Sequence, residues 1–357
     1  MASAGINFEG LTPQNGALRE LAELIFLNIQ EEDKLGQLLV FMTEQINGKK
    51  VGFVGKPGLL GKASEGCSPT YDNHLVATSE KTWIIKEWQI SEKICYEDLI
   101  STIAQHFAQN GSDVADLTDT EYMDTIVRPI FEQAIPELII RFAFFGDTDI
   151  EASELQDGVD VGAFNLIDGI WKQLFTGVTE GKTRRVAIAA NEATTVDAQY
   201  EAMRQAGAAT GVLNELIIRT PAKMRNLAGR RFIVTQAFAD MLNLDIQENN
   251  KGSELQWESI FAGIQKTSYQ GVELLAVPQF DEIIQSYLKN TTNANAYDKP
   301  FRVIYGSKDN FRAGTESKES IATLKVWFNE DEQTNKMLAK DTLGALVVSE
   351  EYAAVAY

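Results

Sequence analysis

The chain has 357 residues, of which 44% are hydrophobic and 23% charged, so it can bury a sizeable core and is too apolar for wholesale disorder. Its 51 acidic and 32 basic residues give a net charge of −19. A sequence-specific nucleic-acid-binding protein needs a basic face to release counterions from phosphates, so this charge argues against that class.

The N-terminal quarter combines an extended start, a helical pattern and a glycine-rich stretch. Residues 1–16 are small and polar and predict an extended arm, whereas apolar spacing from Ala17 to Phe41 predicts one or two helices. Residues 47–66 contain six glycines and predict a conformationally free segment with no core of its own. The same stretch contains the four lysines Lys49, Lys50, Lys56 and Lys62. A strand predicted at Thr82–Ile90 completes a long hairpin-like excursion.

The next third is predicted to be mainly helical. One helix is expected at Tyr96–Gln109, and a longer helical tract at Asp119–Phe145 ends at Gly146. Pro129 and Pro136 lie inside the longer tract and predict a kink or a break into two helices. A short helix is expected at Leu166–Phe175.

From Arg184 onward, strands and helices alternate. Four strands are predicted, at Val186–Ala189, Phe232–Thr235, Val272–Val277 and Phe301–Tyr305. Three helices are predicted between them, at Val196–Thr220, Ala237–Leu244 and Phe280–Leu288. The chain then ends in two long strands, Ile321–Phe328 and Asn335–Thr342, followed by a shorter one at Ala345–Val348.

Motifs that would carry chemistry are weak throughout. The run Gly177–Thr183 has three residues between its glycines instead of four and follows a helix, so it predicts a turn and not a nucleotide loop. His74, His106 and the two cysteines match no metal-ligand spacing. The acidic pairs Asp281-Glu282 and Glu350-Glu351 are interpreted as solvated faces. We therefore expect no metal, no cofactor and no enzymatic activity.

The order of the predicted elements resembles that of the major capsid proteins of tailed bacteriophages, whose fold encapsulins share. Four segments carry the local resemblance: Ala143–Asp147 at the end of the long helix, the strands within Gly229–Gln236 and Gly271–Pro278, and the turn at Asp309–Thr315. The two prolines in the long helical tract depart from the straight helix of that family.

The resemblance implies an α+β fold of the tailed-phage major capsid type. Such a fold has an N-terminal arm, an extended loop, a peripheral domain with a spine helix and a long narrow β-sheet, and an axial α/β domain. The implied boundaries are 1–45 for the arm, 46–95 for the extended loop, 96–185 with 316–343 for the peripheral domain, and 186–315 with 344–357 for the axial domain.

The function implied by the resemblance is that of a structural subunit, which self-assembles into hexamers and pentamers of an icosahedral shell around double-stranded DNA. The expected partners are further copies, portal, scaffold or decoration proteins and non-specifically contacted DNA, with no membrane. No signal peptide is recognised, so assembly in the host bacterial cytoplasm and location in the virion are expected. An encapsulin-like cargo compartment and a soluble α/β enzyme with a dispersed active site stay open as alternatives.

Candidate contacts between subunits follow from charge. A basic flexible loop on an acidic subunit suits the acidic surface of a neighbour. The basic candidates are Lys49, Lys50, Lys56 and Lys62, and the acidic candidates on the long helical tract are Glu121, Asp124, Glu132 and Glu137.

Overall fold

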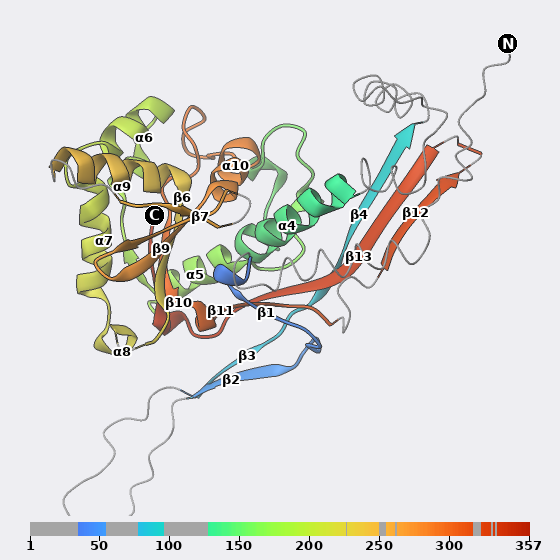
Figure 1. The fold of residues 1–357 in the computed structure, drawn as a ribbon, viewed down its shortest axis with the longest axis horizontal. Helices are drawn as coiled ribbons and strands as arrows, with labels where there is room; N and C mark the ends of the chain where they lie inside the picture. The colour runs from blue at the N-terminus through green and yellow to red at the C-terminus, as the bar shows by residue number, and fades with distance from the viewer. Residues whose placement is uncertain are drawn as a thin grey trace, which may run out of the picture.

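The computed structural model describes residues 35–54, 78–95, 128–225, 227–249, 255–260, 263–316, 323–329, 331–332 and 334–357. Within these residues, a sheet with helices on both faces forms one end of the molecule, and a long narrow sheet extends away from it (Figure 1). A two-stranded hairpin projects in a third direction. The predicted helix at Tyr96–Gln109 and the histidines His74 and His106 lie outside the described residues.

The larger sheet has seven described strands of mixed direction. In spatial order they are β5 (Arg184–Val186), β14 (Ala353–Ala356), β10 (Val303–Ser307), β6 (Arg230–Thr235), β9 (Val272–Val277), β8 (Gln265–Tyr269) and β7 (Glu258–Ser259). β6 pairs in parallel with β9 and antiparallel with β10. These three central strands are almost wholly buried, which is the pattern expected where helices cover both faces of a sheet.

The helices divide between the two faces of this sheet. One face carries α6 (Val196–Met203), α7 (Ala208–Arg219) and α9 (Gln236–Asn249), and α8 (Ala222–Arg225) follows α7. The other face carries α4 (Arg128–Phe145), α5 (Ile170–Thr179) and α10 (Pro278–Ser286). The side chains of β6 alternate accordingly, because Phe232 and Val234 join the first cluster while Ile233 joins the second.

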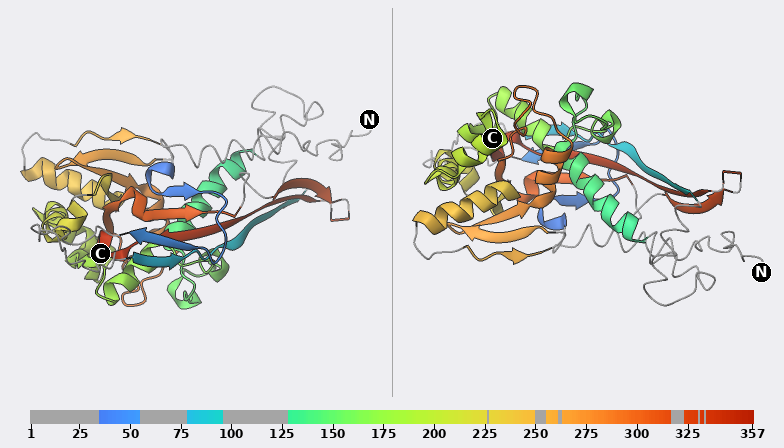
Figure 2. Two further views of the ribbon diagram at one scale, coloured as in Figure 1. Left: turned by 90° about the horizontal axis from the view of Figure 1, so that it is seen from below. Right: turned by 90° about the horizontal axis from the view of Figure 1, so that it is seen from above.

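The narrow sheet is built on one long strand. β13 (Thr334–Val347) pairs through residues 334–343 with β4 (Lys86–Cys95) and through residues 344–347 with β11 (Phe311–Gly314). β12 (Thr323–Asn329) pairs on its other side, and β1 (Val40–Met42) lies beside β11. Figure 2 shows that β4, β12 and β13 extend beyond the rest of the described chain.

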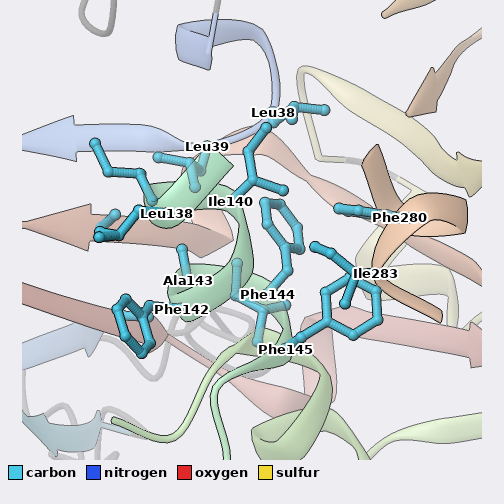
Figure 3. Close-up of a cluster of buried hydrophobic side chains, with 14 of the residues drawn as sticks. Leu38, Leu39, Leu138, Ile140, Phe142, Ala143, Phe144, Phe145, Phe280 and Ile283 are labelled. Atoms are coloured by element: carbon cyan, nitrogen blue, oxygen red, sulfur yellow. The ribbon is translucent and has the colours of Figure 1, made fainter. Parts of the chain in front are cut away.

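The C-terminal half of α4 joins the two sheets. Its residues from Leu138 to Ile140 and from Phe142 to Phe145 are all buried, so this part of the helix is apolar on every side except at Arg141 (Figure 3). The rings of Phe144 and Phe145 lie 4.8 and 5.2 Å from that of Phe280 in α10. The same cluster contains Met337 and Ala339 of β13. The junction between the two sheets is therefore one continuous hydrophobic core.

Short 3₁₀ turns complete the described structure. They are Leu35–Gln37, Ala152–Glu154, Val161–Ala163, Ala189–Glu192, Lys308–Asn310 and Glu350–Tyr352.

Many predicted elements are confirmed, several with shifted ends. The strand Val272–Val277 is found with the predicted bounds, and strands at Phe232–Thr235 and Phe301–Tyr305 correspond to β6 and β10. The helices predicted at Leu166–Phe175, Ala237–Leu244 and Phe280–Leu288 correspond to α5, α9 and α10. The Gly177–Thr183 run contains the end of α5 and then the predicted turn, at Glu180 and Gly181, where Gly181 has a φ of 73°.

The described part of the predicted helix Ala17–Phe41 is not an α-helix. Residues 35–37 form a 3₁₀ turn and Val40–Met42 form β1. Leu38 and Leu39 are buried against the junction core, which accounts for their apolar character, and pairing with β11 replaces helical hydrogen bonds. Tertiary contacts therefore override the local spacing here.

Three further predictions are corrected in the strands and helices. The predicted strand Thr82–Ile90 is interrupted at residues 83–85, where the chain leaves one strand partner for another. The predicted helix Val196–Thr220 is divided at Gly207, whose φ of 80° is left-handed. The predicted break before Ala345 is absent, because β13 continues to Val347.

The long helix also differs from its prediction. α4 continues through Pro136 without dividing, although a proline inside a helix removes one backbone hydrogen bond at a cost of about 3 kcal/mol. Phe131, Ile135, Leu138 and Ile139 around it are all buried. Burying these side chains outweighs that cost, since each contributes about 1.5–3 kcal/mol.

Asp281 is a helix cap and not a solvated surface group, contrary to the sequence interpretation. Its Oδ2 and Oδ1 accept hydrogen bonds from the backbone N–H groups of Gln236 and Ala237, at 2.5 and 2.9 Å, at the start of α9. Burial raises the pKa of this carboxyl to about 6, although the two backbone hydrogen bonds favour the charged form. Asp281 thus connects α10 to α9.

Asp341 is a buried carboxylate in the middle of β13. Its Oδ1 accepts hydrogen bonds from the Thr315 hydroxyl at 3.0 Å and from the Thr342 backbone N–H at 2.7 Å. Burial raises the pKa of Asp341 to about 6, against the opposing effect of these hydrogen bonds. The Thr315 contact holds the end of the β11 segment against β13.

We predict that Asp281→Ala lowers the free energy of unfolding by about 1–2 kcal/mol, because two N–H groups at the start of α9 lose their acceptor. Urea unfolding followed by circular dichroism measures this loss. Glu282→Ala, at the exposed neighbouring position, is the matched control and should change stability by less than about 0.5 kcal/mol. Equal effects of the two substitutions would contradict the capping role.

We also predict a pH dependence at Asp341. Its folded pKa of about 6 exceeds the model-peptide value of 3.8, so between pH 4 and 6 the folded state binds a proton that the unfolded state has released. Stability from this group therefore falls as the pH rises through that window, by at most about 3 kcal/mol. Asp341→Asn, which keeps an acceptor for both donors, should flatten the curve and raise stability at pH 7.5.

Thermal unfolding at half-unit pH steps between 4 and 7.5 tests this prediction. Asp309→Asn, at an exposed carboxylate, is the control and should leave the shape of the curve unchanged. If the Asp341→Asn curve runs parallel to that of the wild type, Asp341 does not have the raised pKa.

Candidate inter-subunit surfaces

The projecting hairpin consists of β2 (Lys50–Val54) and β3 (Thr78–Thr82), which pair antiparallel. Figure 1 shows it leading away from both sheets. Lys49 and Lys50 are exposed at its base, whereas Lys56 and Lys62 lie outside the described residues. A hairpin in this position presents its lysines to another molecule more readily than to its own core.

Hydrogen bonds join the two ends of the hairpin to each other at its base. The Gly48 N–H donates to the Trp83 carbonyl and the Trp83 N–H donates to the Lys49 carbonyl, both at 2.9 Å. The Asn47 side chain accepts from the Ile85 N–H at 3.1 Å. The Trp83 side chain is fully buried with Ile85 and Leu346. This packing explains why the predicted strand is interrupted at residues 83–85.

An ion pair ties the hairpin to the C-terminal segment. Lys81 of β3 contacts the Glu350 carboxylate, whose side chain is 12% exposed. The interpretation of Glu350 as a solvated acid is therefore wrong, and the exposed neighbour Glu351 fits it. A half-buried pair of this kind holds the direction of the hairpin because moving the strand would leave a charge partly desolvated.

A groove of about 610 Å³ runs between α4 and β4. It is lined by six consecutive residues of β4, 87–92, and by one stripe of α4 at spacings of three and four residues: Ala134, Glu137, Leu138 and Arg141. Its apolar floor includes Leu138, Phe142 and Leu166. No described strand pairs with the outer edge of β4, so the groove borders a free strand edge.

The rim of this groove is predominantly acidic. Glu87, Glu92, Glu137 and Asp160 line it, and Arg141, at 3.3 Å from Glu137, is the cation among the lining residues. We call this feature the acidic groove. It combines backbone hydrogen-bonding groups, apolar surface and negative charge, which suits an extended segment with basic and apolar side chains.

The predicted acidic contact residues have different outcomes. Glu137 is half-exposed on α4 and lies in the acidic groove. Glu132 is also on α4, while Glu121 and Asp124 lie outside the described residues. Glu87, Glu92 and Asp160 were missed by the sequence reasoning. Their grouping depends on the placement of β4 beside α4, which no local pattern reports.

A smaller cavity of about 210 Å³ lies where α5 meets the loop after α10. Its charged groups pair with one another: Lys172 lies 2.8 Å from Asp147, and the buried Arg302 lies 2.8 Å from Asp298. Burial lowers the pKa of the Arg302 guanidinium, although Asp298 opposes this effect. The guanidinium also faces the rings of Phe145 and Trp171, at 5.3 and 5.6 Å. These contacts assign the cavity a structural role.

In the part of the chain that the structure describes, no group of three or more His, Cys, Asp or Glu side chains could hold a metal ion. In the same residues, no helix has the length and apolarity that crossing a bilayer requires.

Comparison with known proteins rests on structure alone. No protein-family model and no curated protein matches the chain. Its fold matches a chain of the satellite phage P4 procapsid structure, which includes the size determination protein, with a TM-score of 0.51 and 9% identity over 93% of this chain and 98% of that one. It also matches a chain from the capsid of an empty GTA particle, with a TM-score of 0.50 and 15% identity over 91% and 89% of the two chains.

These matches extend over nearly the whole of each chain, so they concern the complete arrangement of elements and not one shared motif. Both come from capsid particles, and the described structure contains the long helix, the narrow sheet and the α/β unit that the sequence resemblance implied. The α+β class is confirmed, and the chain has the fold of phage-type capsid proteins.

Proposed function

We propose that this chain is a major capsid protein, which self-assembles into the hexamers and pentamers of an icosahedral shell enclosing double-stranded DNA. The observation that carries this proposal is the structural match over 93% of this chain and 98% of a chain from a phage procapsid. Surfaces that the described part of the subunit leaves uncovered support the proposal. A projecting hairpin and a free strand edge beside a partly apolar groove are surfaces that a neighbouring subunit can cover.

The proposed role is structural and not enzymatic. The subunit acts through repeated modest contacts, and copies of itself are its main partners. Portal, scaffold or decoration proteins are further proposed partners, and packaged DNA is contacted non-specifically. The net charge of −19 suits a container wall that does not trap DNA. The proposed location is the virion, after assembly in the host bacterial cytoplasm.

The proposed domains have the boundaries expected from the sequence. Residues 1–45 act as an arm, and residues 46–95 as an extended loop. Residues 96–185 with 316–343 form the peripheral domain, and residues 186–315 with 344–357 form the axial domain around the centre of a capsomer.

Within a shell, the basic loop of one subunit is proposed to lie in the acidic groove of its neighbour. Lys56 and Lys62 flank Leu59 and Leu60 in the sequence, so cations and apolar side chains occur together. Seven extended residues, 56–62, span about 20 Å, and the six groove-lining residues of β4 span about 17 Å. Each exposed ion pair contributes at most about 1 kcal/mol, but the contact recurs around the whole shell.

The first prediction from this proposal concerns assembly. Purified protein should form capsomers or closed shells by size-exclusion chromatography and negative-stain electron microscopy. Shells that protect DNA from nuclease support the capsid role, and DNA-free shells holding a cargo protein support the encapsulin-like alternative. A species that stays near 39.6 kDa or forms only small oligomers contradicts the shell proposal and favours the soluble-enzyme alternative.

The second prediction concerns the basic loop. Replacing Lys49, Lys50, Lys56 and Lys62 by Ser should lower the yield of shells and the salt concentration at which they dissociate, because the charge contacts between subunits are lost. Light scattering across a NaCl series measures both. The matched control replaces four lysines outside the loop, Lys182, Lys266, Lys289 and Lys308, by Ser. Wild-type yield and salt tolerance in the loop variant would refute this contact.

A further inference from the structure

The face of the narrow sheet opposite α4 is unusually basic for this chain. Met337 and Ala339 of β13 are buried in the junction core, so their neighbours Lys336, Leu338 and Lys340 point to the other face. The same alternation places Lys93 of β4 on that face. On β12, Val326 is buried, so Lys325 and Trp327 point outward. We call Lys93, Lys325, Lys336, Lys340 and Trp327 the lysine face.

Strand register brings these side chains together across the sheet. Trp327 lies opposite Lys336, which lies opposite Lys93, so the three form one row. Lys325, Leu338 and Ser91 form the next row. Opposite residues of antiparallel strands have Cβ atoms about 4.5–5.5 Å apart, so the lysines and the indole form one continuous patch.

This patch is unfavourable for the isolated subunit. Like charges placed directly opposite each other destabilise a sheet, and Lys93 faces Lys336 in this way. Described ion pairs reach Lys336 from Glu332 at 3.0 Å and Lys340 from Glu87 at 3.6 Å, and both acids are exposed. Trp327 is 38% exposed, which makes it one of the large apolar side chains open to solvent. Neither the facing lysines nor the exposed indole stabilises the fold of the isolated subunit.

We propose that the lysine face binds an acidic surface of a second copy of this chain. The charge balance supports this occupant, because every copy carries 19 more acidic than basic residues. Exposed acidic segments are present: residues 147–160 contain six acids and no base. Glu332 of the same chain already pairs with Lys336 and lies near Lys93, and a partner carboxylate would add a second counter-charge for these two lysines. The indole edge supplies apolar contact beside the charges.

A protein partner fits better than DNA. The lysine face is confined to a narrow sheet, and the surrounding chain is strongly acidic, which opposes the approach of a polyanion as long as a duplex. A short acidic surface needs no such extended basic track. The inference rests on the proposed self-association, but it does not require a closed shell, since any head-to-tail pair of copies uses the contact.

Lys93→Glu is the sharpest test because it should weaken association without destabilising the subunit. The substitution replaces a like-charge pair with Lys336 by an opposite-charge pair but also places a carboxylate near Glu332, so the isolated subunit should melt near the wild-type temperature. Self-association should nevertheless weaken about tenfold at 50 mM NaCl, since an attraction at the interface becomes a repulsion. Sedimentation velocity over a concentration series measures association, and differential scanning fluorimetry measures melting.

Matched variants distinguish an effect of charges on the lysine face from an effect of the net charge of the chain. Lys93→Glu with Lys336→Glu should reduce association further, whereas Lys182→Glu with Lys308→Glu, which changes the net charge equally at other sites, should leave it near the wild-type value. Trp327→Ser should weaken association without changing its dependence on NaCl concentration. Wild-type association in the Lys93 and Lys336 double variant overturns the inference, as does an equal loss in the control pair.

Two further measurements distinguish binding of a second copy from binding of DNA, and this inference from the shell function. If a fluorescent DNA duplex binds the wild type and is released by the double substitution while self-association stays unchanged, the lysine face is a nucleic-acid site and the inference is overturned. If oligomers of the wild type depend on Lys93 and Lys336 but electron microscopy finds no shells, the inference stands and the shell function fails. A wild type that stays monomeric at all concentrations overturns both.

Discussion

The whole architecture depends on burial of the C-terminal half of α4. From Leu138 to Phe145, seven of eight residues are buried, and they contact α10 on one side and β13 on the other. A helix segment that is apolar on nearly every side must be enclosed, so this segment brings the two sheets together. At about 25 cal/mol for each square ångström of apolar surface buried, such a cluster outweighs any single surface pair in the molecule. The narrow sheet can therefore extend far from the main core because its root is fixed.

β13 connects the buried core to the projecting part of the narrow sheet. Its residues 344–347 pair with β11 beside the core, while residues 334–343 carry β4 into the projecting region. Gly344 has a special place in this strand, because a Cβ there would lie 2.8 Å from the Ile84 carbonyl oxygen. The glycine lets the interrupted segment at residues 83–85 cross close to β13, and Trp83 fills the space beside it. The direction of the hairpin follows from this crossing.

The projecting narrow sheet has two surfaces of opposite charge. One edge of the narrow sheet borders the acidic groove, and the face opposite α4 carries lysines and Trp327. Two surfaces of opposite charge on one subunit suit contacts in which one copy meets the next through different patches. Such contacts form rings or larger arrays instead of simple two-fold pairs, which agrees with a shell-forming role.

The sequence by itself determined the two long C-terminal strands, the three central strands β6, β9 and β10 of the larger sheet, and the long helix ending at Phe145. These features follow from local periodicity and from residues such as Gly146 that end elements. The sequence also marked Glu137 and Lys49 as exposed charges. Only the tertiary structure decided that Leu38 and Leu39 lie in the turn before β1 and pack on the junction core, and that Asp281 caps α9. Likewise, only the fold placed Glu87, Glu92 and Asp160 beside Glu137, and Lys93 opposite Lys336. Those placements arise from strand register and from packing between residues far apart in the sequence, and no local pattern encodes either.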